Sequence, residues 1–360
     1  MRTTGLPLRG HHETSGAVFR SEAGWSVPGS YGPVSSEVAA VRTAAGAIDL
    51  SDRGKVEVRG PDRVTFLDGL LTADVKVLEP GTLTYALVLT DKSRVVGDVR
   101  VVAFEDRLLL DVEAAQKEVI LDHVRRHLVS DDVDLVDLGS VGHLEVHGPR
   151  AVAAASAAIG RDLRATAPNR VGTFPLGKRE TGHAAHVRTL EEPAIALWAS
   201  AGTLEPIWER LLRSGAAPVG RDAFETLRVE AGVPRVGADM GEFTLALEVA
   251  PEGSISFTKG CYVGQEVVAR ATYRGHMNRK LLGLKIDGDV PPAHGDRVVA
   301  AGSEVGRVTS GAWSPTLGRP IALALLRIDR VSAGDPIFVD RAGWDLRAAL
   351  HPLPFVRGHS

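Results

Sequence analysis

The sequence predicts an α+β fold that ends in a separate all-β domain, and two patterns support this prediction. Up to about residues 275–285, amphipathic helical segments alternate with short strand-like segments. Beyond that point only strand-like segments remain, separated by Gly, Pro and Asp, which is typical of a small barrel or sandwich. With 360 residues, 44% of them hydrophobic, the chain is long enough for two or three domains with well-buried cores.

The individual elements follow from the spacing of apolar residues. The first 35 residues are rich in Gly, Ser and Pro and are expected to lie as an arm over the surface. Helices are predicted where apolar residues recur every three or four positions, and strands where they alternate. The expected helices are 35–50, 61–75, 114–129 and 149–160, and the expected strands are 55–60, three within 83–112, 141–149, 279–287, 296–300, 303–311, 319–328 and 335–340. A strand followed by Gly-Pro and a helix occurs twice, which indicates a possible internal duplication.

Composition narrows the function classes. A formal net charge of −3 gives no general attraction to nucleic acid or to an anionic membrane. The single cysteine, Cys261, cannot form an internal disulfide, which is typical of a reducing compartment. No apolar run is long enough to span a bilayer, the N-terminus lacks the apolar core of a signal peptide, and no phosphate-binding glycine loop is present. We therefore expect a cytoplasmic protein with no membrane partner and no direct nucleic-acid partner.

Several segments resemble the aminomethyltransferase (glycine cleavage T-protein) superfamily. These segments are EAGWSVPGSYG at 22–32, VRTAAGAIDLS at 41–51, FLDGLLTADV at 66–75, TLRVEAGVP at 226–234 and VTSGAWSPTLGRPIALALLR at 308–327. Within this superfamily, KGCYVGQEVVAR at 259–270 is similar to the motif of the YgfZ branch of folate-binding proteins, which are tied to iron–sulfur cluster assembly and repair. The resemblance implies a bipartite α+β folate-binding region of two interleaved subdomains over 1–278, a C-terminal β-barrel domain over 279–360, and tetrahydrofolate as the cofactor.

Cys261 is the predicted catalytic residue. Lys259 and Arg270 place positive charge close to it in the sequence, which favours the reactive thiolate. One thiolate cannot hold a [4Fe–4S] cluster, which usually takes four cysteines. We therefore expect no resident metal, and instead transient contact with iron–sulfur client enzymes, including those of tRNA modification, or with cluster carrier proteins.

The resemblance also implies a set of folate-binding residues. Glu230 matches a glutamate that grips the pterin ring, and a carboxylate suits this task because it accepts two parallel N–H bonds. Tyr85 matches an aromatic residue near the folate. The remaining predicted folate-binding residues belong to the motif and are Lys259, Tyr262, Gln265 and Arg270.

One position departs from the pattern of the transferases. Their catalytic aspartate is the first of an Asp-Asp pair, and this sequence has Gly97 there, followed by Asp98. Neighbouring residues on a strand face opposite sides, so we expect that Asp98 does not replace the missing carboxylate without a bulge or a register shift. Whether the protein is an enzyme is therefore left open.

Three hypotheses remain at this point. The leading one is a tetrahydrofolate-binding factor that supports assembly or repair of iron–sulfur enzymes through Cys261. The alternative is a folate-dependent aminomethyltransferase or demethylase that acts on a one-carbon donor. The third is a non-catalytic folate sensor or scaffold whose basic segment at 270–280 recruits a partner.

Overall fold

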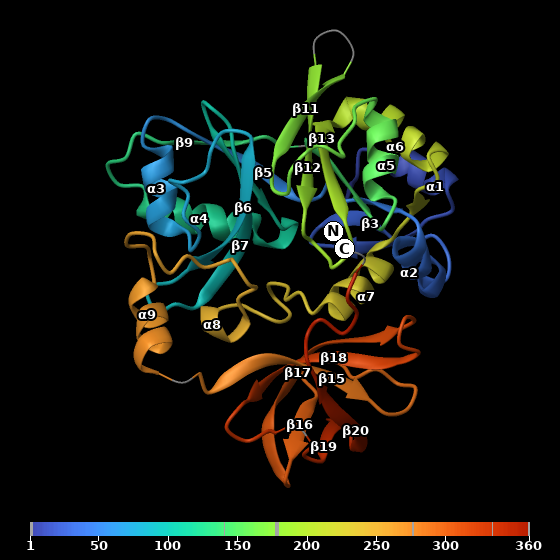
Figure 1. The fold of residues 1–360 in the computed structure, drawn as a ribbon, viewed down its shortest axis with the longest axis vertical. Helices are drawn as coiled ribbons and strands as arrows, with labels where there is room; N and C mark the ends of the chain where they lie inside the picture. The colour runs from blue at the N-terminus through green and yellow to red at the C-terminus, as the bar shows by residue number, and fades with distance from the viewer. Residues whose placement is uncertain (1–2, 140, 177–179, 276, 333, 359–360) are drawn as a thin grey trace.

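The computed structural model consists of two α+β lobes that lie side by side above a β-barrel (Figure 1). It describes residues 3–139, 141–176, 180–275, 277–332 and 334–358. Among these residues, no helix has the length and apolar character needed to cross a membrane.

The first lobe is built on a five-stranded antiparallel sheet, the order of which is β6-β7-β8-β5-β9. Its strands are β5 Gly54–Arg59, β6 Thr82–Leu89, β7 Val95–Ala103, β8 Leu108–Val112 and β9 Asp134–Asp137. Helices α3 (Arg63–Leu70) and α4 (Lys117–His127) bury their apolar side chains against one face of this sheet. The predicted strands at 55–60 and within 83–112 are confirmed, and both helices are shorter than predicted.

The second lobe contains a six-stranded sheet with the order β11-β12-β13-β10-β4-β14. Its strands are β4 Gly46–Asp49, β10 Val141–His147, β11 Val171–Leu176, β12 Glu180–Val187, β13 Ala194–Ser200 and β14 Ala217–Pro218. Helices α5 (Ala151–Ile159) and α6 (Leu204–Arg213) share one apolar core with it. The two strand–helix units of the suspected duplication, β5–α3 and β10–α5, therefore lie in different lobes.

The N-terminal segment is folded, so the prediction of a surface arm is wrong. Strands β1 (Thr4–Gly5), β2 (Val18–Glu22) and β3 (Trp25–Ser30) form a three-stranded sheet, and helix α1 spans Arg9–Thr14. His12 is fully buried, lies 2.9 Å from Asp49 and packs against Trp208 of α6. Apolar anchors are few in this segment, which is why its composition resembles that of a loop.

The helix predicted at 35–50 is two elements. Helix α2 spans Val34–Thr43, and the four residues of β4 that follow are all buried. A short buried strand and a helix end cannot be separated by apolar spacing alone, because both give a continuous apolar run.

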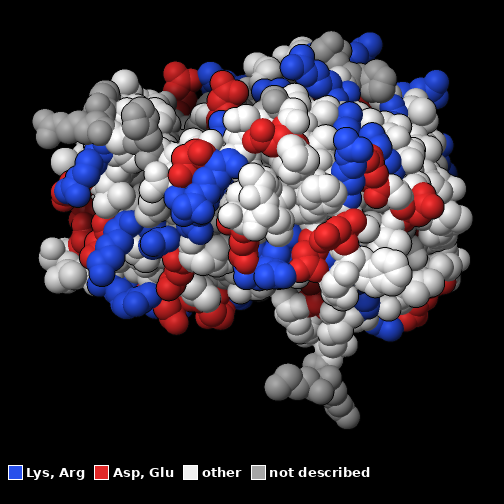
Figure 2. All heavy atoms as spheres, turned by 90° about the horizontal axis from the view of Figure 1, so that it is seen from below, with Lys and Arg blue, Asp and Glu red and all other residues white. Residues whose placement is uncertain are grey.

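The C-terminal strands close into a six-stranded barrel, which confirms the predicted all-β domain. They are β15 Arg279–Ile286, β16 Arg297–Ala300, β17 Ser303–Ser314, β18 Arg319–Arg327, β19 Ile337–Arg341 and β20 Trp344–His351. Three helices precede the barrel: α7 Arg221–Ala231, α8 Ala246–Val249 and α9 Gln265–Arg274. Positive and negative side chains are interspersed on the face seen from below, without one continuous basic patch (Figure 2).

A buried ionic network joins the two lobes. Asp111 of β8 accepts from Arg53 Nε (2.8 Å), lies 3.1 Å from Lys55 Nζ, and lies 3.3 Å from Arg100 Nη1. The same Arg100 nitrogen donates to Glu145 of β10 at 3.0 Å, which connects the two sheets. Burial alone raises the pKa of Asp111, but the charges of Arg53 and Lys55 outweigh it and hold that pKa well below its ordinary value.

The Asp111 network predicts a specific stability defect. In the Asp111→Asn variant the buried cations lose their counter-charge, so we expect the free energy of unfolding to fall by about 3–5 kcal/mol at pH 7. Because the folded-state pKa is depressed, the stabilisation is present above the unfolded-state pKa near 4 and is lost as the pH falls further. Urea denaturation of the wild type and of Asp111→Asn at pH 7 measures the loss of stability. The same comparison at pH 4 and at pH 3 measures how the difference between the two proteins shrinks as the pH falls.

The matched control is Asp106→Asn, since Asp106 is 75% exposed and pairs only with Arg107. Its free energy of unfolding should equal that of the wild type within the error of the measurement. Equal stability of the two variants would show that the network does not hold the lobes together.

Candidate active site

A cavity of about 120 Å³ lies between the first lobe, helix α7 and the segment that follows β12. Its wall combines an apolar part with a large number of charged side chains, seven of which are arginines and four carboxylates. The lining residues are Arg20, Glu22, Arg53, Tyr85, Asp98, Arg100, Glu113, Arg188, Thr189, Leu190, Arg221, Phe224, Glu225, Arg228, Val233, Pro234, Arg235 and Val236. Such a mixture suits a partly apolar ligand that carries charged groups.

The sheet of the first lobe presents Tyr85, Asp98 and Arg100 to the cavity. Tyr85 is paired with Arg100 across β6 and β7, and Asp98 lies two positions before Arg100, so all three share one face. Gly97 faces the opposite side, where an added Cβ would lie 2.7 Å from Cδ1 of Ile120. Asp98 faces the cavity, and Gly97 is the position that lets α4 pack closely. The register of β6 against β7 shifts next to Gly97, between Val88 and Leu89, which is the kind of irregularity that Asp98 needs in order to replace the carboxylate.

Asp98 has the electrostatic properties of an acid–base group. Its Oδ1 atom is buried and has no hydrogen-bond partner within the described ranges. Burial, followed by the negative charge of Glu113, raises the pKa of Asp98 to about 6, while Arg53 and the hydroxyl of Tyr85 act in the opposite direction. A carboxyl group with this pKa exchanges a proton near neutral pH, which acid–base catalysis requires.

Helix α7 forms the opposite wall through Phe224, Glu225 and Arg228. Arg228 donates to both carboxylate oxygens of Glu225 at 2.6 and 2.9 Å and to Asp239 at 2.7 Å. Asp239 in turn accepts from Ser310 of the barrel at 2.8 Å. The barrel thus fixes the side chains of α7 that line the cavity.

A groove lined by the N-terminal sheet, α2, α7 and the barrel adjoins the cavity. This groove measures about 550 Å³, shares Arg20 and Glu225 with the cavity, and includes Trp313 and Pro315 of the barrel. The cavity alone is smaller than the roughly 300–1,000 Å³ typical of sites for drug-sized ligands. A ligand of that size therefore requires both spaces.

Glu230, predicted to bind the pterin ring, does not line the cavity. It is fully buried, and its carboxylate accepts hydrogen bonds from Arg42 (2.6 Å), Ser314 (2.5 Å) and Thr316 (3.1 Å). These contacts join α7 to α2 and to the barrel. Glu230 has no exposed surface and its carboxylate is hydrogen-bonded within the protein, so its contact with the pterin ring stays a prediction.

Lys259, also predicted to bind folate, closes the end of helix α3 instead. Its ammonium group is buried and donates to the carbonyl oxygens of Asp68 (2.6 Å), Leu71 (2.9 Å) and Ala73 (2.7 Å). The carboxylate of Asp68 lies 2.9 Å away and balances its charge. These contacts satisfy carbonyl groups that a helix leaves unpaired at its C-terminus.

The other motif residues lie around this anchor. Tyr262 is buried in the apolar core next to the barrel. Gln265 is the first residue of α9, and its side chain donates to the carbonyl oxygen of Gly260. Gly264 has φ = +83°, and a Cβ there would lie 2.6 Å from the carbonyl oxygen of Thr90, so the motif requires glycine at this position. Most of the motif is therefore explained by packing.

Cys261 and Arg270 are both exposed, and neither lines the cavity. Arg270 pairs with Glu266 on the surface of α9 at 2.6 Å. In the basic segment 270–280, the side chain of Arg274 and all of His276 lie outside the described residues. Of the seven predicted site residues, Tyr85 alone lines the cavity.

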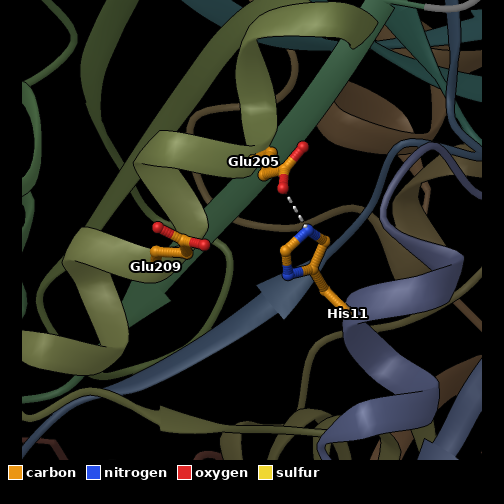
Figure 3. A group of neighbouring side chains, drawn as sticks. All are labelled: His11, Glu205 and Glu209. Carbon is orange, nitrogen blue, oxygen red and sulfur yellow. Dashed lines mark ion pairs between the residues drawn. The ribbon is translucent and has the colours of Figure 1, made fainter.

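One group of described residues has the donor set of a metal site (Figure 3). His11 of α1 faces Glu205 and Glu209, which are one turn apart on α6, and their ligand atoms lie within 4.8 Å of one another. The His11 Nε2 atom lies 2.9 Å from the carboxylate of Glu205. None of the three residues lines the cavity, so the group has no part in the chemistry there.

Known proteins resemble this chain over nearly its full length. Residues 8–259 match the GCVT N-terminal domain, and residues 279–357 match the glycine cleavage T-protein C-terminal barrel domain. The aminomethyltransferase of Rubrobacter xylanophilus is 34% identical over 98% of this chain and 94% of its own length. That of Geobacillus kaustophilus is 34% identical over 98% of both chains. The crystal structure of aminomethyltransferase T of the glycine cleavage system from Bartonella henselae has a TM-score of 0.90 at 25% identity and covers 99% of this chain and 98% of its own.

The position of Glu230 predicts a structural effect without a binding effect. In the Glu230→Gln variant the pairing with Arg42 is weakened, so the free energy of unfolding should fall by about 1–3 kcal/mol. Tetrahydrofolate affinity should stay within about twofold of the wild-type value. Urea denaturation and isothermal titration calorimetry measure the two quantities on the same preparation. A large loss of affinity with unchanged stability would restore Glu230 as a folate ligand.

Proposed function

This chain belongs to the glycine cleavage T-protein family, and on that basis we propose that it transfers a one-carbon unit from an amine donor to tetrahydrofolate. The observation that carries this proposal is the orientation of Asp98 into an arginine-lined cavity, with a pKa near neutrality. The names of the similar proteins, which match over nearly their full length, support the same activity.

Each part of the cavity has a task in this reaction. When bound, tetrahydrofolate supplies the nitrogen that accepts the one-carbon unit. The ionised carboxylate of Asp98 stabilises the positive charge that develops at the carbon as its bond to the donor breaks. It takes up the proton of the attacking nitrogen and returns it to the donor nitrogen, which leaves as the neutral amine. Tyr85 lies on the same face of the sheet as Asp98, lowers the pKa of that carboxyl group and orients it.

The apolar part of the wall suits the flat ring system of a folate. Phe224, Leu190 and Val236 form this part, next to the charged side chains of the first lobe. The groove that contains Trp313 provides room for the remainder of the molecule. Positioning of two reactants in one cavity accounts for part of the rate enhancement.

The YgfZ-type role in iron–sulfur enzymes remains a prediction, as does a cytoplasmic location. This role depends on Cys261 and on the sequence motif around it. Lys259, Tyr262 and Gly264 of that motif have packing roles. The exposed thiol of Cys261 has no such role, and a partner can reach it.

The transferase proposal predicts a pH dependence that arises from Asp98. Because its pKa is raised to about 6, the carboxylate is ionised above that pH and protonated below it. The kcat/KM of the wild-type protein should rise with pH through about 6 and then level off. The Asp98→Asn variant should lose about 10²- to 10⁴-fold in kcat and lose this limb of the profile. Steady-state assays with tetrahydrofolate and an aminomethyl donor, between pH 5 and 8, measure both.

The control is Asp91→Asn, in the exposed turn between β6 and β7, which should leave rate and profile unchanged. An Asp98→Asn protein that is folded and turns over at the wild-type rate would exclude Asp98 from the chemistry.

Cys261 provides a separate test of the iron–sulfur role. The thiol does not line the cavity, so Cys261→Ala should retain kcat/KM for one-carbon transfer within about twofold. In a deletion strain of the native host, the same variant should fail to restore the activity of [4Fe–4S] enzymes if the iron–sulfur role holds. Full restoration by Cys261→Ala would remove the thiol from that role.

A further inference from the structure

The cavity arginines differ in whether they have an acidic partner. Six of the seven contact at least one carboxylate. Their pairs are Arg20 with Glu22 and Asp222, Arg53 with Asp111 and Glu113, Arg100 with Asp111 and Glu145, Arg221 with Asp52, Arg228 with Glu225 and Asp239, and Arg235 with Glu22 and Glu225. The charges of these six arginines are therefore balanced within the protein.

Arg188 is the exception. It lines the cavity directly after β12, is exposed, and makes no hydrogen bond or ion pair within the part of the chain that the structure describes. The guanidinium group of an arginine has five N–H donors in a planar fork. All of these donors are available to a ligand at Arg188.

The backbone that carries Arg188 is held in place. The hydroxyl of the next residue, Thr189, accepts a hydrogen bond from Arg100 at 3.0 Å, and Arg100 belongs to the network that joins the lobes. Leu190 is buried in an apolar core shared with α2 and α7. Arg188 is therefore an unpaired arginine at the cavity, and the two residues that follow it, Thr189 and Leu190, fix the position of its backbone.

We propose that Arg188 binds a carboxylate group of the ligand and thereby selects anionic substrates. This inference rests on the proposed function, and deepens it by naming the chemistry that the cavity recognises. A carboxylate matches the guanidinium fork with two parallel hydrogen bonds. Because the other six cavity arginines are paired with carboxylates, Arg188 supplies the unbalanced positive charge of the described lining.

The carboxylate has two possible sources. One is the glutamyl tail of tetrahydrofolate. The other is the one-carbon donor, which would then be an N-substituted amino acid with its amine toward Asp98 and its carboxylate at Arg188. Both sources share the chemistry that Arg188 recognises, and two pairs of probes separate them.

The experiment measures dissociation constants by calorimetry for the wild type, Arg188→Ala and Arg188→Lys. The first pair of probes is tetrahydrofolate and 6-methyltetrahydropterin, which lacks the glutamyl tail. The second pair is N-methylglycine and methylamine, which lacks the carboxylate. In Arg188→Ala, we expect the carboxylate member of one pair to bind at least about tenfold more weakly, with its partner probe within about twofold. Arg188→Lys should recover part of the loss, since it keeps the charge without the fork.

The pair that responds identifies the source of the carboxylate. The matched control is Arg164→Ala, since Arg164 is 79% exposed, pairs with Asp162 and lies outside the cavity; it should leave all four constants unchanged. The inference about Arg188 is overturned if the wild type binds the probes and Arg188→Ala weakens both members of each pair equally, or weakens none. If the wild type binds neither tetrahydrofolate nor 6-methyltetrahydropterin, the proposed function itself is overturned together with this inference.

Discussion

The geometry of the cavity depends on one buried carboxylate, that of Asp111. It holds Arg53 and Arg100, which both line the cavity, and Arg100 extends to Glu145 and Thr189 of the second lobe. Arg53, Lys55 and Arg100 all lie around Asp111. Burial of these three positive charges would be strongly unfavourable without the negative charge of Asp111. The same contacts that join the two sheets therefore fix the charged wall beside Asp98, so stability and function share one set of side chains in this protein.

Much of the fold could be predicted from the sequence, where local patterns are decisive. The strands β6, β7 and β8 are separated by clear turns and were predicted correctly. In the C-terminal region turn residues separate β15 to β19, which were predicted, whereas β20 at Trp344–His351 was not. The N-terminal segment was not, because His12 is buried through contacts with Asp49 and Trp208, which are distant in sequence. Such long-range pairing leaves no periodic signal in the first 35 residues.

The candidate site was harder to predict, and the reason is physical. The motif around Cys261 is distinctive, but Lys259 closes a helix and Tyr262 fills a core. The decisive feature is the side of β7 that faces the cavity, since one step along a strand reverses the direction of the side chain. Gly97 against Ile120 indicates the packed side, and this contact requires the position of α4, which the sequence does not supply. Alternation along β7 could have placed Asp98 on one face with Arg100, but not in one cavity with Arg188.

In this protein α7 and the segment after β12 complete a cavity that begins on the sheet of the first lobe, and the barrel holds α7 in place through Ser310. The central claim is that tetrahydrofolate occupies this cavity. A crystal structure of the complex tests it most directly. The account predicts the ring system between Phe224 and the Tyr85–Asp98 face, with the rest of the molecule toward Trp313. A folate bound instead at the exposed loop of Cys261, with the cavity filled by solvent, would contradict it.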